Sequence, residues 1–185
     1  MFRAAAWGRF LVRTSWDPSS VAHPDRQSWD EYFLDLARAA STRATCVRRK
    51  HGAVIVRSRR IVATGYNGAP SGYPHCADGA CPRARSDAPQ GHDYESCTAI
   101  HAEANALLFS SPEERDGATL YCTGAPCFGC AKLIANSGIA EVVASGGRYD
   151  GWEHVRDFLR ACGVRIRLLD GFEGSPALDL ASATG

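Results

Sequence analysis

The chain has 185 residues, which is enough for one domain with a substantial core and too few for two comfortable ones. Hydrophobic residues make up 45% and charged residues 22%, a globular composition that excludes a disordered or fibrous chain. The formal net charge of +1 argues against a protein that holds a long stretch of nucleic acid, because such proteins usually display a basic face. No apolar run approaches the roughly 20 residues of a membrane span.

Residues 1–27 are predicted to form an irregular arm, whose first part carries Arg3, Arg9 and Arg13 without an acid. This composition resembles a transit peptide, but the segment lacks the continuous apolar core of a secretory signal. We interpret it as a loose arm or a start-site extension rather than a targeting signal, and we expect a cytoplasmic protein. Without secretion, the eight cysteines are better explained by metal binding than by disulfides.

A helix is predicted to follow the arm, because Ser28 and Glu31 form a capping-box pattern at the start of "SWDEYFLDLARAAS". The β-rich runs "AVIV" and "IVATG" lie on either side of the polar "RSRR", which predicts a hairpin. The next segment, from Tyr66 to Cys97, is rich in Gly, Pro and Cys and is too long for an ordinary connector. Either a role in binding or catalysis, or a bound metal ion that holds the segment together, would explain its length.

Helices and strands alternate in the second half of the chain. "HAEANALLF" predicts a helix, "ATLYCT" a strand, "CFGCAKLIANSG" a helix that ends near Gly138, and "IAEVVAS" another strand. "WEHVRDFLRACG" predicts an amphipathic helix capped by Gly163, and "VRIRLL" predicts a final strand. This order indicates a βαβ layout with parallel pairs. The domain is therefore expected to span residues 28–170, followed by a flexible tail over 171–185.

Two short motifs carry metal-binding residues. His101 opens one predicted helix, and Cys127 and Cys130 form a Cys-x-x-Cys pair at a strand-to-helix turn. A lone Cys-x-x-Cys would suggest a redox pair or two buried thiols. Together with the histidine, the two thiolates suit Zn²⁺ and leave a fourth position open for water, as in a catalytic site.

Glu103 follows His101 by two positions and supplies the remaining chemical group. Zinc lowers the pKa of its bound water toward neutrality, and the resulting hydroxide can attack C4 of a cytosine. The ring nitrogen and the departing amine must each gain a proton, and Glu103, beside the metal but not a ligand, is placed to carry both. This paired signature is the mark of zinc deaminases.

Beyond these motifs, the chain resembles the deoxycytidylate (dCMP) deaminase family, within the cytidine deaminase-like superfamily, from about Trp29 to Leu169. The stretches that carry the resemblance include "TCVRRKHGAVIV", "ATGYNGAPSGYPHC", "IHAEANAL" and "ATLYCTGAPCFGCAKLIANSGI". The resemblance implies a three-layer α/β/α fold with a mixed five-stranded sheet, assembled as a homo-oligomer. It also implies conversion of dCMP to dUMP and ammonia, with dCTP and dTTP as effectors.

Four residues are assigned to substrate binding on this resemblance. Asn67 of "GYNG" is similar to the asparagine with which the family contacts the nucleotide, although Asn-Gly also favours a plain turn. Ala102 belongs to the histidine motif. Arg49 and Lys50, which follow Arg48, either supply phosphate contacts or form a solvated cationic run.

Some family members carry a second, structural zinc, and the resemblance implies one here. A closed structural site needs four ligands. The candidates are Cys46, Cys76, Cys97 and either Cys81 or His92. The alternative is a set of free thiols. Cys122 and Cys162 fall on predicted core elements and are expected to be packing residues.

Three other readings stay open. The chain departs from close relatives at Thr98 and Ala104, near the site, so a related cytosine nucleoside or an aminopyrimidine is an alternative substrate. A zinc-ribbon binding module would explain the cysteine clusters but not Glu103. A tRNA or single-stranded DNA deaminase shares the zinc motif but should show a basic track. The expected partner is a small nucleotide, with neither a membrane nor a long nucleic acid.

Overall fold

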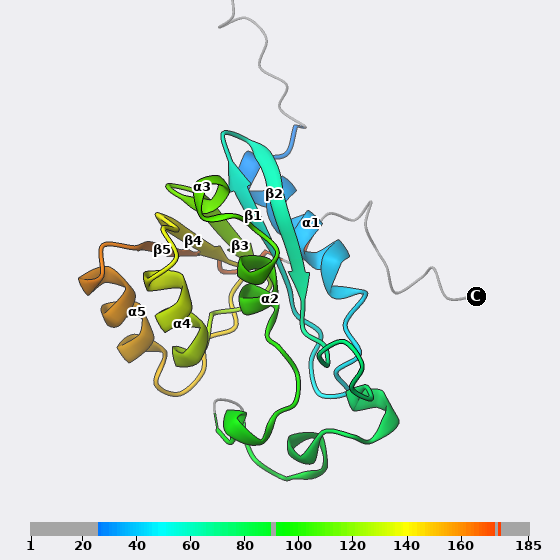
Figure 1. Ribbon diagram of the computed structural model, residues 1–185. Coiled ribbons are helices and arrows are strands. Elements are labelled where there is room, and N and C mark those ends of the chain that lie inside the picture. Colours follow the sequence, from blue (N-terminus) through cyan, green and yellow to red (C-terminus); the bar gives the residue numbers. More distant parts are fainter. Residues whose placement is uncertain (1–25, 90–91, 173, 175–185) are drawn as a thin grey trace, which may run out of the picture.

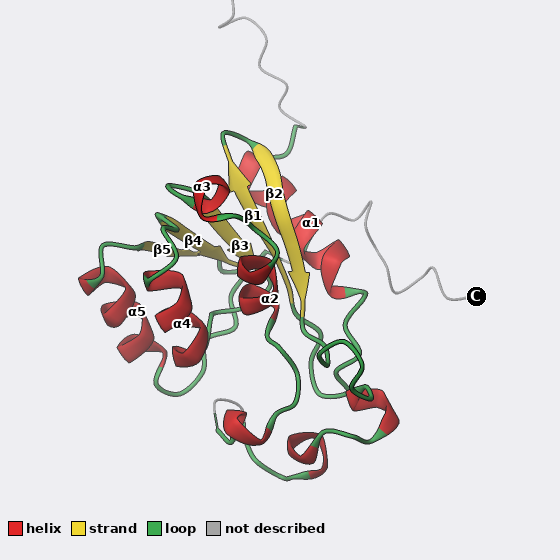
Figure 2. Cartoon of the chain, viewed as in Figure 1, coloured by secondary structure: helices red, strands yellow, loops and turns green. Residues whose placement is uncertain are grey.

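The computed structural model describes residues 26–89, 92–172 and 174 (Figure 1). The predicted arm over 1–27 and the predicted tail over 171–185 lie mostly outside these residues. Within the described part, five strands form one mixed sheet in the order β2-β1-β3-β4-β5, and helices cover both of its faces (Figure 2). The three-layer α/β/α fold with a mixed five-stranded sheet is confirmed. No helix among the described residues is both long and apolar enough to cross a membrane.

Helix α1 (Trp29–Ser41) begins at the predicted capping box. The Ser28 hydroxyl accepts the Glu31 backbone N–H at 3.2 Å, and the Glu31 carboxylate accepts the Ser28 backbone N–H at 2.8 Å. The buried side of α1 packs on one face of the sheet in an apolar cluster. That cluster joins Phe33, Leu34, Ala37, Val54, Val56, Tyr121 and Val143.

The sheet combines an antiparallel half with a parallel half. The predicted hairpin is β1 (Gly52–Arg57) and β2 (Arg60–Tyr66), and β1 also pairs antiparallel with β3 (Thr119–Cys122). The parallel pairs are β3 with β4 (Glu141–Ala144) and β4 with β5 (Arg165–Leu168), as the alternating pattern of helices and strands predicted.

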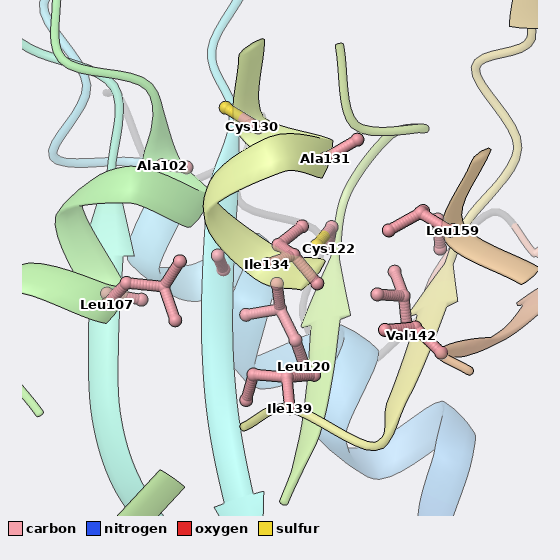
Figure 3. Close-up of a cluster of buried hydrophobic side chains, with 14 of the residues drawn as sticks. Ala102, Leu107, Leu120, Cys122, Cys130, Ala131, Ile134, Ile139, Val142 and Leu159 are labelled. Carbon is pink, nitrogen blue, oxygen red and sulfur yellow. The ribbon is translucent and has the colours of Figure 1, made fainter. Parts of the chain in front are cut away.

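The opposite face of the sheet is covered by α2 (Ala102–Leu108), α4 (Phe128–Ala135) and α5 (Trp152–Ala161). These helices enclose the larger apolar cluster, in which Leu120, Ile134 and Val142 are fully buried (Figure 3). Successive side chains of a strand point to opposite faces of the sheet. Leu120 therefore joins this cluster, while its neighbour Tyr121 joins the cluster under α1.

The structure differs from the sequence predictions in four details. Helix α4 ends at Ala135 rather than near Gly138, which instead has φ +88° in the turn before β4. A one-turn helix, α3 (Pro112–Arg115), lies between α2 and β3. Cys162 is exposed, because it lies at the C-terminal cap of α5 and not in the core. The long loop contains short 3₁₀ helices at Cys76–Asp78, Pro82–Arg85 and Tyr94–Ser96.

Helix α2 lies unusually close to β2 at Gly65. A Cβ atom at Gly65 would lie 2.2 Å from the Ala102 carbonyl oxygen and 2.5 Å from the Ala106 backbone nitrogen. The Asn105 amide adds a hydrogen bond to the Tyr66 carbonyl oxygen at 2.9 Å. The missing side chain at Gly65 therefore fixes how near the first turn of α2 comes to the sheet.

A polar network joins the first helix to the last strand. The Tyr121 hydroxyl donates to Asp30 Oδ1 at 2.9 Å, and Arg167 donates to both Asp30 oxygens at 2.6 and 3.1 Å. Arg167 also donates to Glu141 Oε1 at 2.8 Å. The Arg167 hydrogen bond holds the pKa of Asp30 below its usual value, although partial burial opposes the shift.

Gly65→Ala should destabilise the protein by about 1–3 kcal/mol, because the added methyl group forces the α2 backbone away from β2. Thermal unfolding monitored by circular dichroism measures this loss. Gly68→Ala is the matched control, since its Cβ would meet only ordinary contacts, the nearest at 3.4 Å from the Tyr66 ring. Equal melting temperatures for Gly65→Ala and the wild type would contradict the close packing.

Candidate active site

Two helix N-termini place the predicted metal ligands. His101 is the N-cap of α2, and Cys127 is the N-cap of α4 with Cys130 in the first turn. The two helices pack against each other, and Figure 3 shows Ala102 and Cys130 at the same end of the pair. Antiparallel bridge bonds between Gly68 and Ile100, at 2.9 and 3.2 Å, fix the backbone just before His101.

The three ligand atoms converge on one point. His101 Nδ1 lies 3.4 Å from Cys127 Sγ and 3.5 Å from Cys130 Sγ. All three atoms lie within 4.8 Å of one another, which is the separation that a shared metal ion requires. Among the described residues, this is the one group of three or more His, Cys, Asp or Glu side chains that meets this condition.

The three ligand side chains shift one another's pKa values. The hydrogen bond with Cys130 lowers the pKa of Cys127 to about 4, against the effect of burial, and His101 contributes in the same direction. The hydrogen bond with Cys127 in turn raises the pKa of His101 to about 10. Cys127 is thus a thiolate at neutral pH, the form that binds a metal. One imidazole nitrogen and two thiol sulfurs are a donor set that fits Zn²⁺.

Glu103 lies in the first turn of α2, beside the ligand group, and only 7% of it is exposed. Burial raises the pKa of its carboxyl group, while the His101 charge opposes the shift. A carboxyl group with a raised pKa takes up and releases protons closer to neutral pH than an exposed glutamate does. Glu103 therefore has the placement and environment of an acid–base group.

A cavity of about 350 Å³ opens beside these residues, within the size range of small-ligand pockets. His101, Glu103 and Cys127 form part of its wall, and Asn67 and Ala102 also line it. The sequence analysis assigned all five of these residues to the site, and the structure brings them together around one space.

Asn67 clamps the segment that leads into β1. Its Oδ1 accepts the His51 backbone N–H at 2.7 Å, and its Nδ2 donates to the Arg49 carbonyl oxygen at 2.9 Å. Its own backbone N–H donates to the His51 carbonyl oxygen at 3.1 Å. Asn67 is 7% exposed and lines the cavity, so the clamp shapes that part of the wall.

The three consecutive cationic residues at positions 48–50 differ in their surroundings. Arg49 is exposed and lines the cavity, whereas Lys50 is exposed and is not among the described residues of the wall. Arg48 lines the cavity, but its guanidinium donates to the carbonyl oxygens of Arg83, Ser86 and Ala88 and so anchors the long loop.

The sequence analysis did not select Arg83, Tyr94, Tyr149 or His51, which also line the cavity. Arg83 is 7% exposed, with its guanidinium 4.5 Å from the Tyr94 ring centroid, and Tyr94 packs edge-on against His101. The Tyr149 hydroxyl donates to the Pro126 carbonyl oxygen at 2.9 Å. No local pattern marks these residues, because their roles arise from contacts across the fold.

The second cysteine group is partly assembled. Cys81 Sγ and Cys97 Sγ lie 4.0 Å apart, and burial raises the pKa of Cys76, with Cys46 and Cys81 acting in the same direction. Burial opposes ionisation of Cys81, but hydrogen bonds from the Thr98 and Ala84 backbone outweigh it and lower the pKa of Cys81 to about 7.

His92, the alternative fourth ligand, is exposed, and its carbonyl oxygen accepts a hydrogen bond from Arg83 Nε at 2.9 Å. The structure thus places Cys81 rather than His92 beside Cys97, but the four predicted cysteines do not have all their sulfur atoms within 4.8 Å of one another. Cys122 is buried, as expected for a packing residue, and also borders the cavity.

Solved structures share this fold. The chain matches the dCMP deaminase of cyanophage S-TIM5, in complex with dCMP and dUMP, with a TM-score of 0.58 and 28% identity. The match covers 75% of this chain and 95% of that one. The fold and the His–Cys–Cys group define a protein of the cytidine deaminase-like class.

Sequence comparisons narrow the class. Residues 27–145 match the model of the cytidine and deoxycytidylate deaminase zinc-binding region. A deoxycytidylate deaminase of Mycobacterium phage D29 is 54% identical over 123 residues, covering 64% of this chain and 94% of the relative. The deoxycytidylate deaminase of Schizosaccharomyces pombe is 42% identical over 143 residues, covering 77% of this chain and 44% of the relative. The chain belongs to the cytidine and deoxycytidylate deaminase family.

Proposed function

We propose that this protein is a zinc-dependent enzyme that hydrolyses dCMP to dUMP and ammonia. One observation carries the proposal: His101 and Cys127 of the His–Cys–Cys group, the buried Glu103 and arginine side chains line a single cavity. The first set of groups suits deamination of a cytosine ring, and the second suits a 5′-phosphate. The names of the similar proteins, deoxycytidylate deaminases from phages and yeast, support the same substrate.

His101, Cys127 and Cys130 would hold the catalytic zinc through one nitrogen and two sulfurs. A zinc ion at such a site activates water for attack on an electrophilic carbon, here C4 of the pyrimidine. The pKa of Cys127, held at about 4, keeps this ligand deprotonated across the physiological pH range. Tyr94 packs edge-on against the His101 ring and helps to hold its orientation.

Glu103 moves the protons of the reaction. Deamination adds water, breaks the C4–N4 bond and releases ammonia, so one proton must reach the ring nitrogen N3 and another the leaving amine. Glu103 is placed beside the ligand group and carries a carboxyl group with a raised pKa. Because the same carboxyl group accepts a proton from water and then donates it, one residue serves both transfers.

Arg49 is proposed as the phosphate contact. It lines the cavity and is exposed, and its guanidinium has no hydrogen-bond partner among the described residues, whereas that of Arg48 is bound to loop carbonyl oxygens. Arginine binds phosphate oxygens through charge-assisted hydrogen bonds. Lys50 is a weaker candidate, because it is not part of the described cavity wall. Asn67 and Ala102 complete the proposed substrate-binding residues.

A related cytosine nucleoside, another cytosine nucleotide or an aminopyrimidine is the alternative substrate for the same chemistry, and a nucleic-acid deaminase is the more distant one. Ammonia release from dCMP, deoxycytidine, CMP and an RNA hairpin under one set of conditions separates these substrates. The highest kcat/KM for dCMP supports the proposal.

Family membership supports three further proposals. We propose a homo-oligomer, regulation by dCTP and dTTP, and a cytoplasmic location. We also propose a second, structural zinc held by Cys46, Cys76, Cys81 and Cys97. Its support is the 4.0 Å separation of the Cys81 and Cys97 sulfur atoms and the effect of Cys46 and Cys81 on the pKa of Cys76. A closed zinc site would stabilise the long loop directly, because that loop has few apolar residues.

Glu103→Gln should lower kcat by about 100- to 10,000-fold, because the amide cannot carry protons. The measurement is steady-state ammonia release from dCMP, with zinc content and circular dichroism as checks that metal and fold are retained. Glu153→Gln, an exposed glutamate in the first turn of α5, is the control and should match the wild type. Near-normal turnover by Glu103→Gln would refute the assigned role.

Arg49→Met should lower kcat/KM for dCMP by about 10- to 100-fold, the effect of one lost charge-assisted contact, and leave deoxycytidine unchanged. Lys50→Met is the matched control, since it removes the neighbouring charge outside the cavity wall. Equal losses for both substrates in Arg49→Met would show that Arg49 does not contact phosphate.

Cys76→Ser should reduce bound zinc from two ions per chain to one and lower the melting temperature, while the catalytic ligands stay intact. Elemental analysis and thermal unfolding measure the two effects. Cys162→Ser changes an exposed thiol at the end of α5 and should retain both ions. A wild type with one ion that Cys76→Ser leaves in place would rule out the structural site.

A further inference from the structure

His51 is a cavity residue for which the deamination chemistry above has no role. It directly precedes β1 and lines the cavity. His101 of the ligand group and Arg49, two residues earlier in the chain, line the same cavity. Both are close enough for their charges to act on the His51 ring.

The position of the His51 ring is tightly fixed. The Asn67 clamp holds its backbone through two hydrogen bonds, at 2.7 and 3.1 Å. Nδ1 lies 3.4 Å from Thr123 Oγ1, which also accepts the Gly52 backbone N–H at 3.0 Å. The ring packs against Gly124, where a Cβ atom would lie only 3.0 Å from His51 Cε1. A side chain held this firmly is suited to a directional contact.

One ring nitrogen is left for a ligand. The Nδ1–Cε1 edge faces Thr123 and Gly124, and Nε2 has no hydrogen-bond partner among the described residues. Burial lowers the pKa of His51, and the charge of Arg49 acts in the same direction, which favours the neutral ring. A neutral imidazole with Nδ1 beside a hydroxyl can present Nε2–H as a donor to an uncharged oxygen.

We infer that His51 recognises the sugar of the nucleotide by a hydrogen bond from Nε2 to the 3′-hydroxyl group. This inference rests on the proposed function, which puts the cytosine ring at the His–Cys–Cys group and the phosphate at Arg49. The sugar joins those two parts of the substrate, and His51 lines the same cavity as the residues proposed to bind them. The 3′-hydroxyl is the single free hydroxyl of a 2′-deoxyribose 5′-phosphate, and a neutral ring suits it better than it suits a phosphate dianion.

The test combines two variants with two substrates. His51→Leu keeps an apolar side chain of similar reach and removes the donor, whereas His51→Gln retains a terminal N–H group. The substrates are dCMP and 2′,3′-dideoxycytidine 5′-monophosphate, which lacks the 3′-hydroxyl. His51→Leu should lower kcat/KM for dCMP by about two- to tenfold, mainly through KM, and should not change kcat/KM for the dideoxy substrate. His51→Gln should recover part of the loss.

Equal losses on both substrates would overturn the inference and make His51 a shape-determining residue. A loss that disappears with deoxycytidine but persists with the dideoxynucleotide would also overturn it, because it would assign His51 to the phosphate. Calorimetric binding of dUMP and of 2′,3′-dideoxyuridine 5′-monophosphate to the zinc-loaded protein gives a second readout, with the same pattern expected.

The binding experiment also separates this inference from the proposed function. A wild type that binds dUMP more tightly than its dideoxy analogue, with the difference abolished in His51→Leu, supports the role of His51 even if dCMP is turned over poorly. A wild type that deaminates dCMP but shows no difference between the two nucleotides in binding or turnover contradicts His51 alone. A wild type that neither binds dUMP nor deaminates dCMP contradicts both.

Discussion

The close packing of α2 on β2 is the constraint on which the rest of the site depends. His101 and Glu103 occupy the N-cap and first turn of α2, so the height of this helix above the sheet sets their distance from the two cysteines of α4. The glycine at position 65 permits that height, since any Cβ there would overlap the Ala102 carbonyl group. A packing contact between two backbones thus determines whether three ligand atoms can share one ion.

The substrate side of the cavity is organised by a different means. The substrate side consists mainly of loop segments, whose backbone groups lack the regular hydrogen bonds of a helix or strand. Side chains supply hydrogen bonds to these backbone groups instead. Arg48 satisfies loop carbonyl oxygens, and Asn67 satisfies the backbone on both sides of Lys50. Polar side chains that look like substrate contacts in the sequence therefore act first as supports, and they leave Arg49 and His51 facing the cavity.

Local patterns were sufficient to predict most of the helices and strands and to mark the ligand group, whereas the mixed five-stranded sheet was predicted from the family resemblance. The capping box at Ser28, the hairpin around "RSRR" and the alternation after residue 101 each depend on neighbours a few positions apart. The same is true of Cys127 and Cys130, whose spacing is set by one helical turn. Arg83 and His51 could not be found in this way, because only the tertiary fold brings the long loop and the start of β1 to the same cavity. Cys162 was misplaced for a related reason: a helix-terminal residue can point outward even when the helix is amphipathic.

The network of Asp30, Tyr121 and Arg167 bears on the order in which the chain can fold during synthesis. Its members come from α1, β3 and β5, and the hydrogen bonds between Asp30 and Arg167 span 137 positions. A ribosome releases α1 long before Arg167 is made, so the helix emerges with its carboxylate still lacking this cation. The first helix can complete its contacts only when the last strand has left the exit tunnel. Folding of this domain is therefore expected to finish late and as one cooperative step, in which β5 docks against α1.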